Sequence, residues 1–337
     1  MCFASDNTAS ICPEILAAIT AANGDPAAAY GDDPWTRRMD GALSAYFGTQ
    51  VRAFAVTTGT AANSLALATL SPPYGAIYCH PEAHIAVDEC CAPGFFTGGA
   101  QLERIAGTHG KLTAEAVAAT LDSHAVTVHT VQPAAVSISQ ATERGTAYRP
   151  EEVAGLCEVA HARGLHLHMD GSRFANAVTF LGCHPGDVTW RAGVDVLSFG
   201  ATKNGALCAE AVVFFDLGLV RDFELRRKRA GHLLSKSRFV SAQLLAYIES
   251  GVWRRNAERA NALARRIGEA AGERLLEPVE ANEVFIELGA SGKASLRAAG
   301  FEFYDWGPPA SGEARLATSW DQNERHVEAL CAALTAM

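Results

Sequence analysis

The stretch Leu165-His166-Leu167-His168-Met169-Asp170-Gly171-Ser172-Arg173 gives the clearest indication of the fold. Successive side chains of a strand point to opposite faces, so His166, His168 and Asp170 would share one face, and the apolar residues between them the other. In open α/β sheets, ligands bind in the crevice beyond the carboxyl ends of the strands. The segment therefore predicts a strand that presents Asp170 to a ligand site.

Similar short apolar runs alternate with helical stretches over the first two thirds of the chain. Runs of this kind are typical of a mostly parallel sheet that is covered by helices on both faces. Helices are expected at Thr60–Leu70 and Pro150–Arg163, the second with a proline at its start and Gly164 as its stop. The expected strands are Arg52–Val56, Ala76–His80, Ala125–Val131, Leu165–Met169, Val194–Phe199 and Ala211–Phe215.

The pattern changes after about residue 217. Long helical stretches run from Leu219 to about Ala271, and shorter elements follow, so we expect a smaller α+β domain after the large α/β domain. We place the large domain, including the N-terminal segment, at residues 1–245 and the small domain at residues 246–337. The later elements are strands at Glu283–Leu288, Phe301–Tyr304 and Glu313–Thr318 and helices at Ser291–Ala299 and Asn323–Ala336.

The composition excludes several classes of protein. Of the 337 residues, 49% are apolar and 19% are charged, and a net charge of −9 argues against a nucleic-acid surface. No apolar run approaches the ~20 residues that span a bilayer, and the N-terminus lacks the pattern of a secretory signal. Nine cysteines without a CxxC pair indicate neither a disulfide framework nor a zinc site. We expect a cytoplasmic protein with reduced thiols that binds neither nucleic acid nor a membrane.

The segment around Asp170 fits more than one kind of site. His166, His168 and Asp170 offer nitrogen and oxygen ligands to a metal ion. Alternatively, Asp170 could face the pyridinium nitrogen of a cofactor and keep that nitrogen protonated. A third interpretation is an ordinary buried histidine pair beside a capping aspartate, and the segment alone leaves all three open.

Two further segments favour a cofactor. Thr57–Ser64 joins an expected strand to an expected helix, where small residues and free N–H groups suit a phosphate, although the segment is neither a Walker loop nor a dinucleotide fingerprint. Lys203 lies among the small residues of Ser198–Gly205, where desolvation would lower its pKa and free its amine. A phosphate-binding turn, an aspartate after one strand and a lysine after the next are what pyridoxal 5′-phosphate (PLP) requires. We therefore predict a PLP enzyme in which Lys203 holds the cofactor as a Schiff base.

Six ordered segments resemble the motifs of the L-threonine aldolase family, which belongs to the PLP enzymes of fold type I, the aspartate-aminotransferase-like fold. The similarity runs from Ser5 to the C-terminal helix and is closest to a low-specificity branch that includes phenylserine aldolases. The segments are Ser5-Asp6-Asn7, Tyr30-Gly31-Asp32-Asp33-Pro34, Thr58-Gly59-Thr60-Ala61-Ala62-Asn63, Ala83-His84-Ile85, His168-Met169-Asp170-Gly171-Ser172-Arg173 and Thr202-Lys203-Asn204-Gly205.

The resemblance implies a role for each matching residue at the cofactor. Lys203 would form the Schiff base, and Asp170 would pair with the ring nitrogen. His84 would stack on the pyridine ring and act on the β-hydroxyl of the substrate directly or through water. Gly59 and Thr60 would bind the phosphate.

The resemblance also implies a substrate clamp and a shared active site. Ser5, Arg173 and Arg315 would hold the carboxylate of an amino-acid substrate, because arginine offers bidentate geometry. Family sites lie between subunits, so a neighbour in a homodimer or homotetramer would supply Tyr30 and two cations near the phosphate. The cations in the family positions are Arg229 and Lys236, whereas Arg226 and Arg227 are expected to be surface residues.

One departure from the family pattern concerns the β-hydroxyl. Many members carry Asn-Thr-His-Asn after the central strand, and the histidine helps to handle this hydroxyl. Here the segment reads Ser139-Gln140-Ala141-Thr142-Glu143, so the histidine is absent. Gln140 or Thr142 could bind the hydroxyl in its place.

The reaction implied by the resemblance is reversible retro-aldol cleavage of an L-3-hydroxy-α-amino acid, such as threonine, allo-threonine or phenylserine, to glycine and an aldehyde. Two alternatives keep PLP, namely an amino-acid racemase and a β-eliminating lyase. A metal-dependent hydrolase that uses His166, His168 and Asp170 is the alternative from another class. A PLP-type fold kept only for binding or regulation disagrees with the intact set of Lys203, Asp170 and Arg173.

Overall fold

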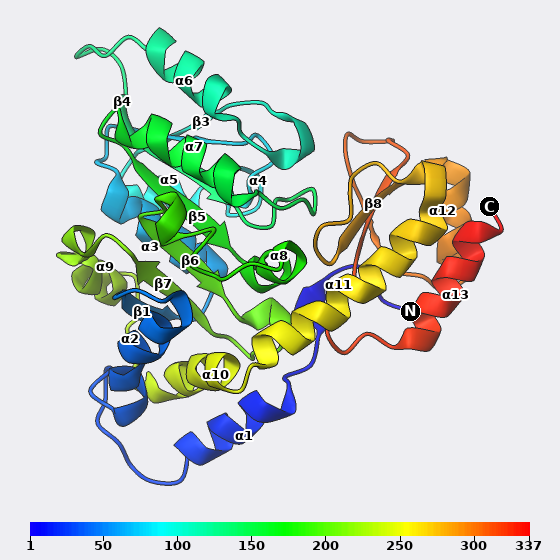
Figure 1. The fold of residues 1–337 in the computed structure, drawn as a ribbon, viewed down its shortest axis with the longest axis horizontal. Coiled ribbons are helices and arrows are strands. Elements are labelled where there is room, and N and C mark those ends of the chain that lie inside the picture. Colours follow the sequence, from blue (N-terminus) through cyan, green and yellow to red (C-terminus); the bar gives the residue numbers. More distant parts are fainter.

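The strand predicted from the His-x-His-x-Asp pattern, β5 (His166–Gly171), lies in the middle of a seven-stranded sheet in the computed structural model, which describes residues 1–337 (Figure 1). The strand order is β1-β7-β6-β5-β4-β2-β3, and β7 alone runs antiparallel to its neighbours. The mostly parallel sheet is therefore confirmed. The other strands are β1 (Arg52–Val56), β2 (Gly75–Cys79), β3 (Gln101–Arg104), β4 (Gln132–Ser139), β6 (Val196–Gly200) and β7 (Glu210–Phe214).

The register of the central strands brings polar residues to one edge of the sheet. Asp170 lies opposite Ser139 of β4 on one side and Ser198 of β6 on the other. Gly200 closes β6, and a Cβ there would lie 2.8 Å from the backbone of Ser172, so only glycine allows the two strand ends to approach this closely. The chain that follows β6 consequently passes beside the end of β5.

Helices cover both faces of the sheet. On one face, α3 (Gly59–Leu70) packs on β5, β6 and β7, and its buried side chains form a core of 17 residues with strand residues such as Phe54 and Phe214. The other face carries a core of 42 residues, in which Phe199 packs edge-on against Phe47 and Phe174 at centroid distances of 6.0 Å. Each buried aromatic side chain of this kind contributes ~1.5–3 kcal/mol to stability.

The remaining helices of this part surround the sheet and its edges (Figure 1). They are α1 (Pro13–Ala22), α2 (Pro34–Phe47), α4 (His84–Val87), α5 (Ala92–Thr97), α6 (Ala114–Ser123), α7 (Pro150–His161), α8 (Phe174–Leu181), α9 (Phe223–Arg229) and α10 (Arg238–Glu249). Short 3₁₀ turns occur at Asp6–Thr8 (η1), Thr108–Gly110 (η2), Trp190–Ala192 (η3), Thr202–Asn204 (η4), Leu217–Val220 (η5) and Gly272–Arg274 (η6).

The C-terminal part is built on an antiparallel sheet in the order β8-β10-β9, so the smaller α+β unit is confirmed. Phe3 from the N-terminus lies in its core, and Cys2 pairs with Glu302, which places the N-terminus beside this unit (Figure 1). The division at residues 245 and 246 stays a prediction. The elements are α11 (Val252–Ala271), β8 (Glu283–Glu287), α12 (Gly289–Ala298), β9 (Tyr304–Asp305), β10 (Glu313–Ala317) and α13 (Glu324–Thr335).

The predicted strand at Ala125–Val131 is wrong. This segment is a loop in which Val126 and Val128 are 66% and 96% exposed, and the strand β4 begins only at Gln132. The true strand has Pro133 near its start, and a proline in a run argues against a strand. The short edge strand β3 was not predicted.

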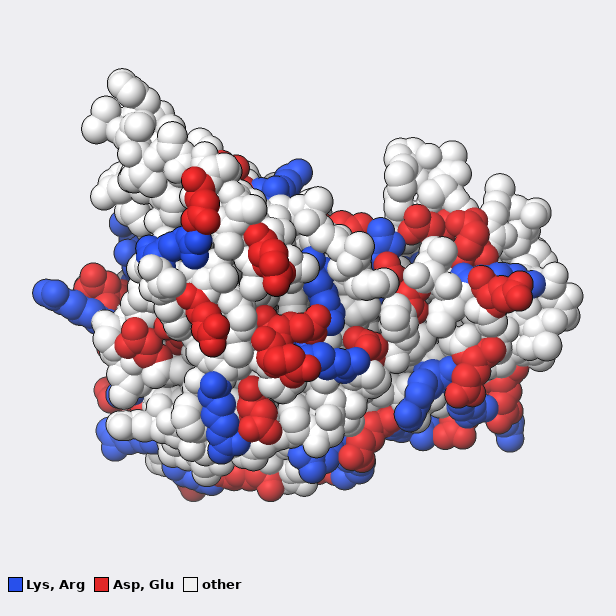
Figure 2. Space-filling view, turned by 45° about the horizontal axis from the view of Figure 1, so that its top comes forward, with Lys and Arg blue, Asp and Glu red and all other residues white.

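No helix of the structure is both long and apolar enough to cross a membrane. On the face drawn in Figure 2, lysine and arginine side chains are interspersed with aspartate and glutamate. A nucleic-acid surface needs a basic patch or stripe, and this face has none.

Candidate active site

Three adjoining cavities lie at the edge of the sheet where β4, β5 and β6 end, and His84 and Lys203 line all three. The first, of about 300 Å³, extends to the start of α3. The second, of about 380 Å³, extends to the C-terminal unit, and a small one of about 20 Å³ lies beside Asp170. The crevice predicted from the strand pattern is therefore present.

Lys203 lies in η4, directly after β6, and its amine makes no hydrogen bond or ion pair within the chain. Burial, followed by the positive charge of Arg173, lowers its pKa from the usual value of 10.5. A lowered pKa increases the fraction of neutral amine, which is the nucleophilic form that a Schiff base needs. The geometry therefore supports Lys203 as the cofactor lysine.

Asp170 lies at the end of β5, where the residue is 4% exposed. Its carboxylate accepts three hydrogen bonds. Ser172 donates its backbone N–H (3.0 Å) and its hydroxyl (2.6 Å) to Oδ1, and Asn63 donates to Oδ2 (2.8 Å). Burial raises the pKa of Asp170, but the charge of His84 and the bonds from Ser172 outweigh burial, so the pKa lies below 3.8. A carboxylate that stays charged in this position can keep a pyridine nitrogen protonated.

A buried network that the sequence did not predict links Asp170 to His84. Nδ1 of His84 donates to Oε1 of Glu89 (2.9 Å), and the same oxygen accepts from Nδ2 of Asn63 (2.8 Å), which also donates to Asp170. The bond to Glu89 raises the pKa of His84 above 6.5. Asn63 belongs to the Thr58–Asn63 motif, but the sequence indicated no role for it. Glu89 lies five positions after His84 and outside every motif, so its contact with His84 could not be predicted from the sequence.

The start of α3 forms a cradle for a phosphate. Thr58 caps the helix by accepting from Ala61, which leaves the N–H groups of Gly59 and Thr60 without an acceptor in the chain. A Cβ on Gly59 would have only Ser172 Oγ, 3.9 Å away, within 4 Å, so the space beside this residue is open. Free N–H groups at a helix N-terminus bind anions. These groups, with Lys203 and Asp170, fit PLP.

The cradle lacks an arginine. Lys203 is the only lysine or arginine among the residues that line this cavity, and its amine is the group that would join the cofactor, while His84 would lie against the ring. The cavity also contains Glu210, whose pKa burial raises to about 7. A phosphate would therefore have no cationic partner of its own within one chain.

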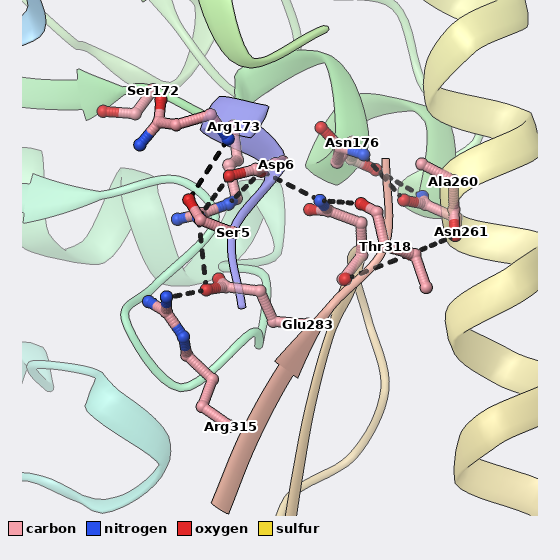
Figure 3. Close-up of polar contacts among 12 residues, drawn as sticks. Ser5, Asp6, Ser172, Arg173, Asn176, Ala260, Asn261, Glu283, Arg315 and Thr318 are labelled. Carbon is pink, nitrogen blue, oxygen red and sulfur yellow. Dashed lines mark hydrogen bonds and ion pairs between the residues drawn. The ribbon is translucent and has the colours of Figure 1, made fainter. Parts of the chain in front are cut away.

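Ser5, Arg173 and Arg315, predicted as the carboxylate clamp, line the cavity of about 380 Å³ together. Unexpectedly, both arginines already bind carboxylates (Figure 3). Nε and Nη2 of Arg173 donate to Asp6 (2.8 and 2.9 Å), and Oε1 of Glu283 lies 3.3 Å from Arg173 Nη2 and 3.4 Å from Arg315 Nη1. The four groups are neutral together, and Nη1 of Arg173 remains without a partner.

Other contacts fix Arg315 at the mouth of the same cavity. Its Nη2 donates to the carbonyl of Ala4 (2.9 Å), and its guanidinium lies 5.0 Å from the Tyr304 ring and 5.1 Å from the Trp306 ring. The arginine therefore links the N-terminal segment to β10 and β9. Neither Asp6 nor Glu283 was predicted to act here, although Asp6 belongs to a quoted motif.

The three residues expected from a neighbouring subunit lie away from the crevice. Tyr30 is exposed, and its N–H donates to Ser235 (3.0 Å) while the Lys228 amine lies 4.7 Å from its ring. Arg229 and Lys236 are exposed on the same stretch of chain, and neither lines the cavities around Lys203. Within one chain the structure does not bring these residues to the site.

Arg227 was expected on the surface, and this expectation is wrong. Its side chain is buried rather than on the surface, stacks 5.3 Å from the Phe54 ring and donates to the carbonyl of Ala55 (3.3 Å). Arg227 therefore belongs to the packing of α9 against β1.

The segment that departs from the family pattern presents a glutamate to the crevice. Gln140 is fully buried and forms two hydrogen bonds with the backbone of Tyr148, and Thr142 bonds to Thr146 and to the carbonyl of His109. Neither side chain is free to bind a substrate hydroxyl, so this expectation is wrong. Glu143 instead lines two of the three cavities.

The metal interpretation of the His-x-His-x-Asp segment does not fit the structure. Both ring nitrogens of His168 are engaged, with Ser137 and Ser198 at 2.9 Å, and burial lowers the pKa of His168 to about 4. His166 lies at the other end of the strand, 3.8 Å from Asp195. The two histidines and Asp170 therefore do not converge on one ion.

The fold, the free lysine, the buried aspartate and the phosphate cradle together define a PLP-dependent enzyme of the aminotransferase-like fold. A model of the beta-eliminating lyase family, whose members depend on PLP, matches residues 3–291. The low specificity L-threonine aldolases of Pseudomonas sp. and Pseudomonas aeruginosa are each 43% identical to this chain, over 99% and 97% of its length and 97% and 95% of theirs. The chain belongs to this family and, within it, to the threonine aldolases, as the resemblance predicted.

Solved structures agree with this assignment. A threonine aldolase of Leishmania major superimposes with a TM-score of 0.92 at 25% identity, covering 99% of this chain and 98% of that one. Aspartate aminotransferase of Thermus thermophilus gives a TM-score of 0.73 at 16% identity over 99% and 91% of the two chains, which shows the shared fold.

Proposed function

We propose that this chain cleaves the Cα–Cβ bond of L-3-hydroxy-α-amino acids of the threonine, allo-threonine or phenylserine type and releases glycine and an aldehyde. The observation that carries the proposal is the meeting of Lys203, Asp170 and two arginines around connected cavities. The 43% identity to two low specificity L-threonine aldolases supports the same reaction.

The residues of the first cavity and of the small cavity beside it would hold the cofactor. Lys203 would supply the amine, Gly59 and Thr60 would donate to the phosphate, and Asp170 would hold a proton on the ring nitrogen. His84 would lie against the ring. PLP, when bound there, supplies an electron sink for the bond that breaks.

The residues of the second cavity would bind and orient the amino acid. Its carboxylate would accept hydrogen bonds from the free Nη1 of Arg173, from Arg315 and from the hydroxyl of Ser5. Orientation matters because the Cα–Cβ bond must align with the π system of the ring to break readily. Asp6 and Glu283 hold both guanidinium groups in place before the substrate arrives, which reduces the entropy lost on binding.

We also propose that the active enzyme is a symmetric homodimer or homotetramer whose subunits share their sites. The cradle lacks a cation of its own, whereas Arg229, Lys236 and Tyr30 lie together on an exposed surface. Beside Arg229, the exposed side chains of Phe95 (79%) and Leu225 (71%) line an apolar cavity of about 690 Å³. A neighbour related by a two-fold axis would cover these apolar side chains and exchange cations reciprocally.

The state of the cysteines is relevant to the cellular compartment in which the protein works. All nine are free, including the exposed pair Cys90 and Cys91. Free exposed thiols support the proposal of a cytoplasmic protein, because disulfides persist mainly in oxidising compartments.

Product analysis tests the proposed reaction. The purified holoenzyme is incubated with threonine, allo-threonine and phenylserine, and glycine and aldehyde are measured together. Equal amounts of the two products from at least one substrate support cleavage. A racemase would return the enantiomer or epimer, and a β-eliminating lyase would release ammonia and a 2-oxo acid, so either result without glycine would overturn the proposal.

A further inference from the structure

Glu143 is a side chain that lines two of the three cavities and has no role in the cofactor site or the carboxylate clamp. It follows β4 and reaches back to the strand, where its Oε1 accepts from the hydroxyl of Ser139 (2.6 Å) and from the backbone N–H of His84 (2.8 Å). These two donors fix the position of the carboxyl group. Its other oxygen, Oε2, is buried and has no hydrogen-bond partner.

Glu143, whose Oε2 is unpaired, borders a cavity of the right size for one small polar group. The cavity of about 20 Å³ is shared by Glu143, Lys203, Asp170 and Arg173. A space of ~10–15 Å³ or more holds one water-sized group. Because a buried acceptor without a partner costs ~1–3 kcal/mol, the arrangement favours a ligand group that completes it. A hydroxyl on the β-carbon of an amino acid would be such a group.

We infer that Glu143 is the catalytic residue that accepts the proton of the substrate's β-hydroxyl, in place of the histidine that the 139–143 segment lacks. The inference rests on the proposed function. The hydroxyl proton moves to Oε2, and the electron pair of the broken O–H bond forms the carbonyl of the aldehyde. The Cα–Cβ bond breaks, its electron pair remains with the glycine fragment, and Cα takes a proton from solvent. Glu143 then returns its own proton to solvent.

The electrostatics of the site suit this role. Burial raises the pKa of Glu143, the bond from Ser139 lowers it, and the negative charge of Asp170 raises it, to about 7 overall. A base with a pKa near the working pH combines a useful charged fraction with good proton affinity. The charged or titratable groups that line the same cavities as the carboxyl are His84, Asp170, Arg173 and Lys203 at the small cavity, and also Asp88, Glu283, Tyr304, Asp305 and Arg315 at the larger one.

The first test compares Glu143→Gln with the wild-type holoenzyme. The amide keeps the shape and an acceptor oxygen for Ser139 and His84 but cannot take a proton. We expect kcat for cleavage to fall by ~100-fold or more, while the dissociation constant for glycine, which has no β-hydroxyl, changes less than about threefold. A kcat within about threefold of wild type would overturn the inference, as would a parallel loss of glycine binding, which would indicate a structural role.

The second test has two readouts, and the first of them uses the cofactor-free protein and does not depend on turnover. The infrared difference between wild type and Glu143→Gln isolates the carboxylic-acid band of Glu143 from that of Glu210, and we expect the band to titrate near pH 7, as the pKa of about 7 requires. In turnover, kcat of the wild type should fall on the acid side of the same pH, and Ser139→Ala, which removes a bond that lowers the pKa, should move that limb to higher pH. A band that titrates near pH 4, the usual region for glutamate, or an unmoved limb would overturn the inference.

The outcomes separate this inference from the proposed function. If the wild type releases glycine and aldehyde and Glu143→Gln does so equally fast, the function stands and the inference fails. If the wild type cleaves none of the three hydroxy amino acids, both fail.

Discussion

Nδ1 of His84 donates a hydrogen bond of 2.9 Å to Oε1 of Glu89, whose side chain is completely buried. The bond fixes the orientation of the imidazole and leaves Nε2 as the nitrogen that is free to face the crevice. Asn63 joins the same carboxylate to Asp170. One hydrogen-bond network therefore holds both His84, which is expected against the cofactor ring, and Asp170, which is expected at the ring nitrogen.

Replacing Glu89 with glutamine should lower the pKa of His84. Its folded pKa now lies above the unfolded value of 6.5 because of this bond, so the bond stabilises the fold fully below that value and loses its contribution as the pH rises through the folded pKa. The stability lost in Glu89→Gln should be larger near pH 5 than near pH 9, where the buried Glu89 charge is itself unfavourable. NMR titration of His84 and unfolding at both pH values measure the effect, and an unchanged His84 midpoint would rule it out.

Lys203→Ala should abolish turnover and leave the fold intact, since the amine makes no hydrogen bond or ion pair within the chain. Borohydride should fix PLP to the wild type at Lys203 and not to the variant, as peptide mapping would show. Lys111→Ala is a matched control, because Lys111 pairs with Glu152 away from the crevice and its loss should leave labelling unchanged. Labelling of another lysine in the wild type would refute the assignment.

Arg315→Met should raise KM more than it lowers kcat. Hydrogen bonds to charged groups contribute ~1.5–3 kcal/mol, which corresponds to a ~10- to 150-fold rise in KM for the amino acid. Arg259→Met, which removes an exposed pair with Glu324, is the control and should behave like the wild type. Arg173 is less suitable for this test, because its removal would leave Asp6 buried without its cation. An unchanged KM in Arg315→Met would exclude the clamp.

Mixing two inactive variants should restore activity if subunits share their sites. When Arg229→Ala and Lys203→Ala subunits exchange, one site of each hybrid dimer carries both defects and the other carries neither. We expect up to about one quarter of wild-type activity from a statistical mixture. The double variant Lys203→Ala/Arg229→Ala should stay inactive under the same treatment. If labelled subunits demonstrably exchange and no activity returns, Arg229 does not act across an interface.

The order and type of most elements could be predicted because buried parallel strands leave nearly continuous apolar runs. Arg52–Val56 was predicted to the residue, and β5 to within two residues. The error at Ala125–Val131 arose because alternation of apolar residues also occurs in an exposed loop, where no partner strand is available. The small edge strand β3 has only four residues and no clear pattern.

The site was predictable where a residue follows a strand and not where contacts come from distant parts of the chain. Lys203 and Asp170 could be found because each follows a recognisable strand. Glu283 reaches Arg173 from the C-terminal sheet, and Asp6 reaches the same arginine from the N-terminus, pairings that only the folded chain brings together. Glu143 follows the strand in a turn, and its place in the crevice depends on bonds from Ser139 and His84 that the sequence alone does not show.

Cleavage of the Cα–Cβ bond by this chain is tested most directly with uniformly ¹³C-labelled L-threonine. When the holoenzyme is mixed with the labelled substrate, carbon NMR follows every carbon in one tube. We expect doubly labelled glycine and doubly labelled acetaldehyde to appear at the same rate, and none with Lys203→Ala. A product that keeps all four carbons joined, whether 2-oxobutanoate or the other stereoisomer, would contradict cleavage of this bond.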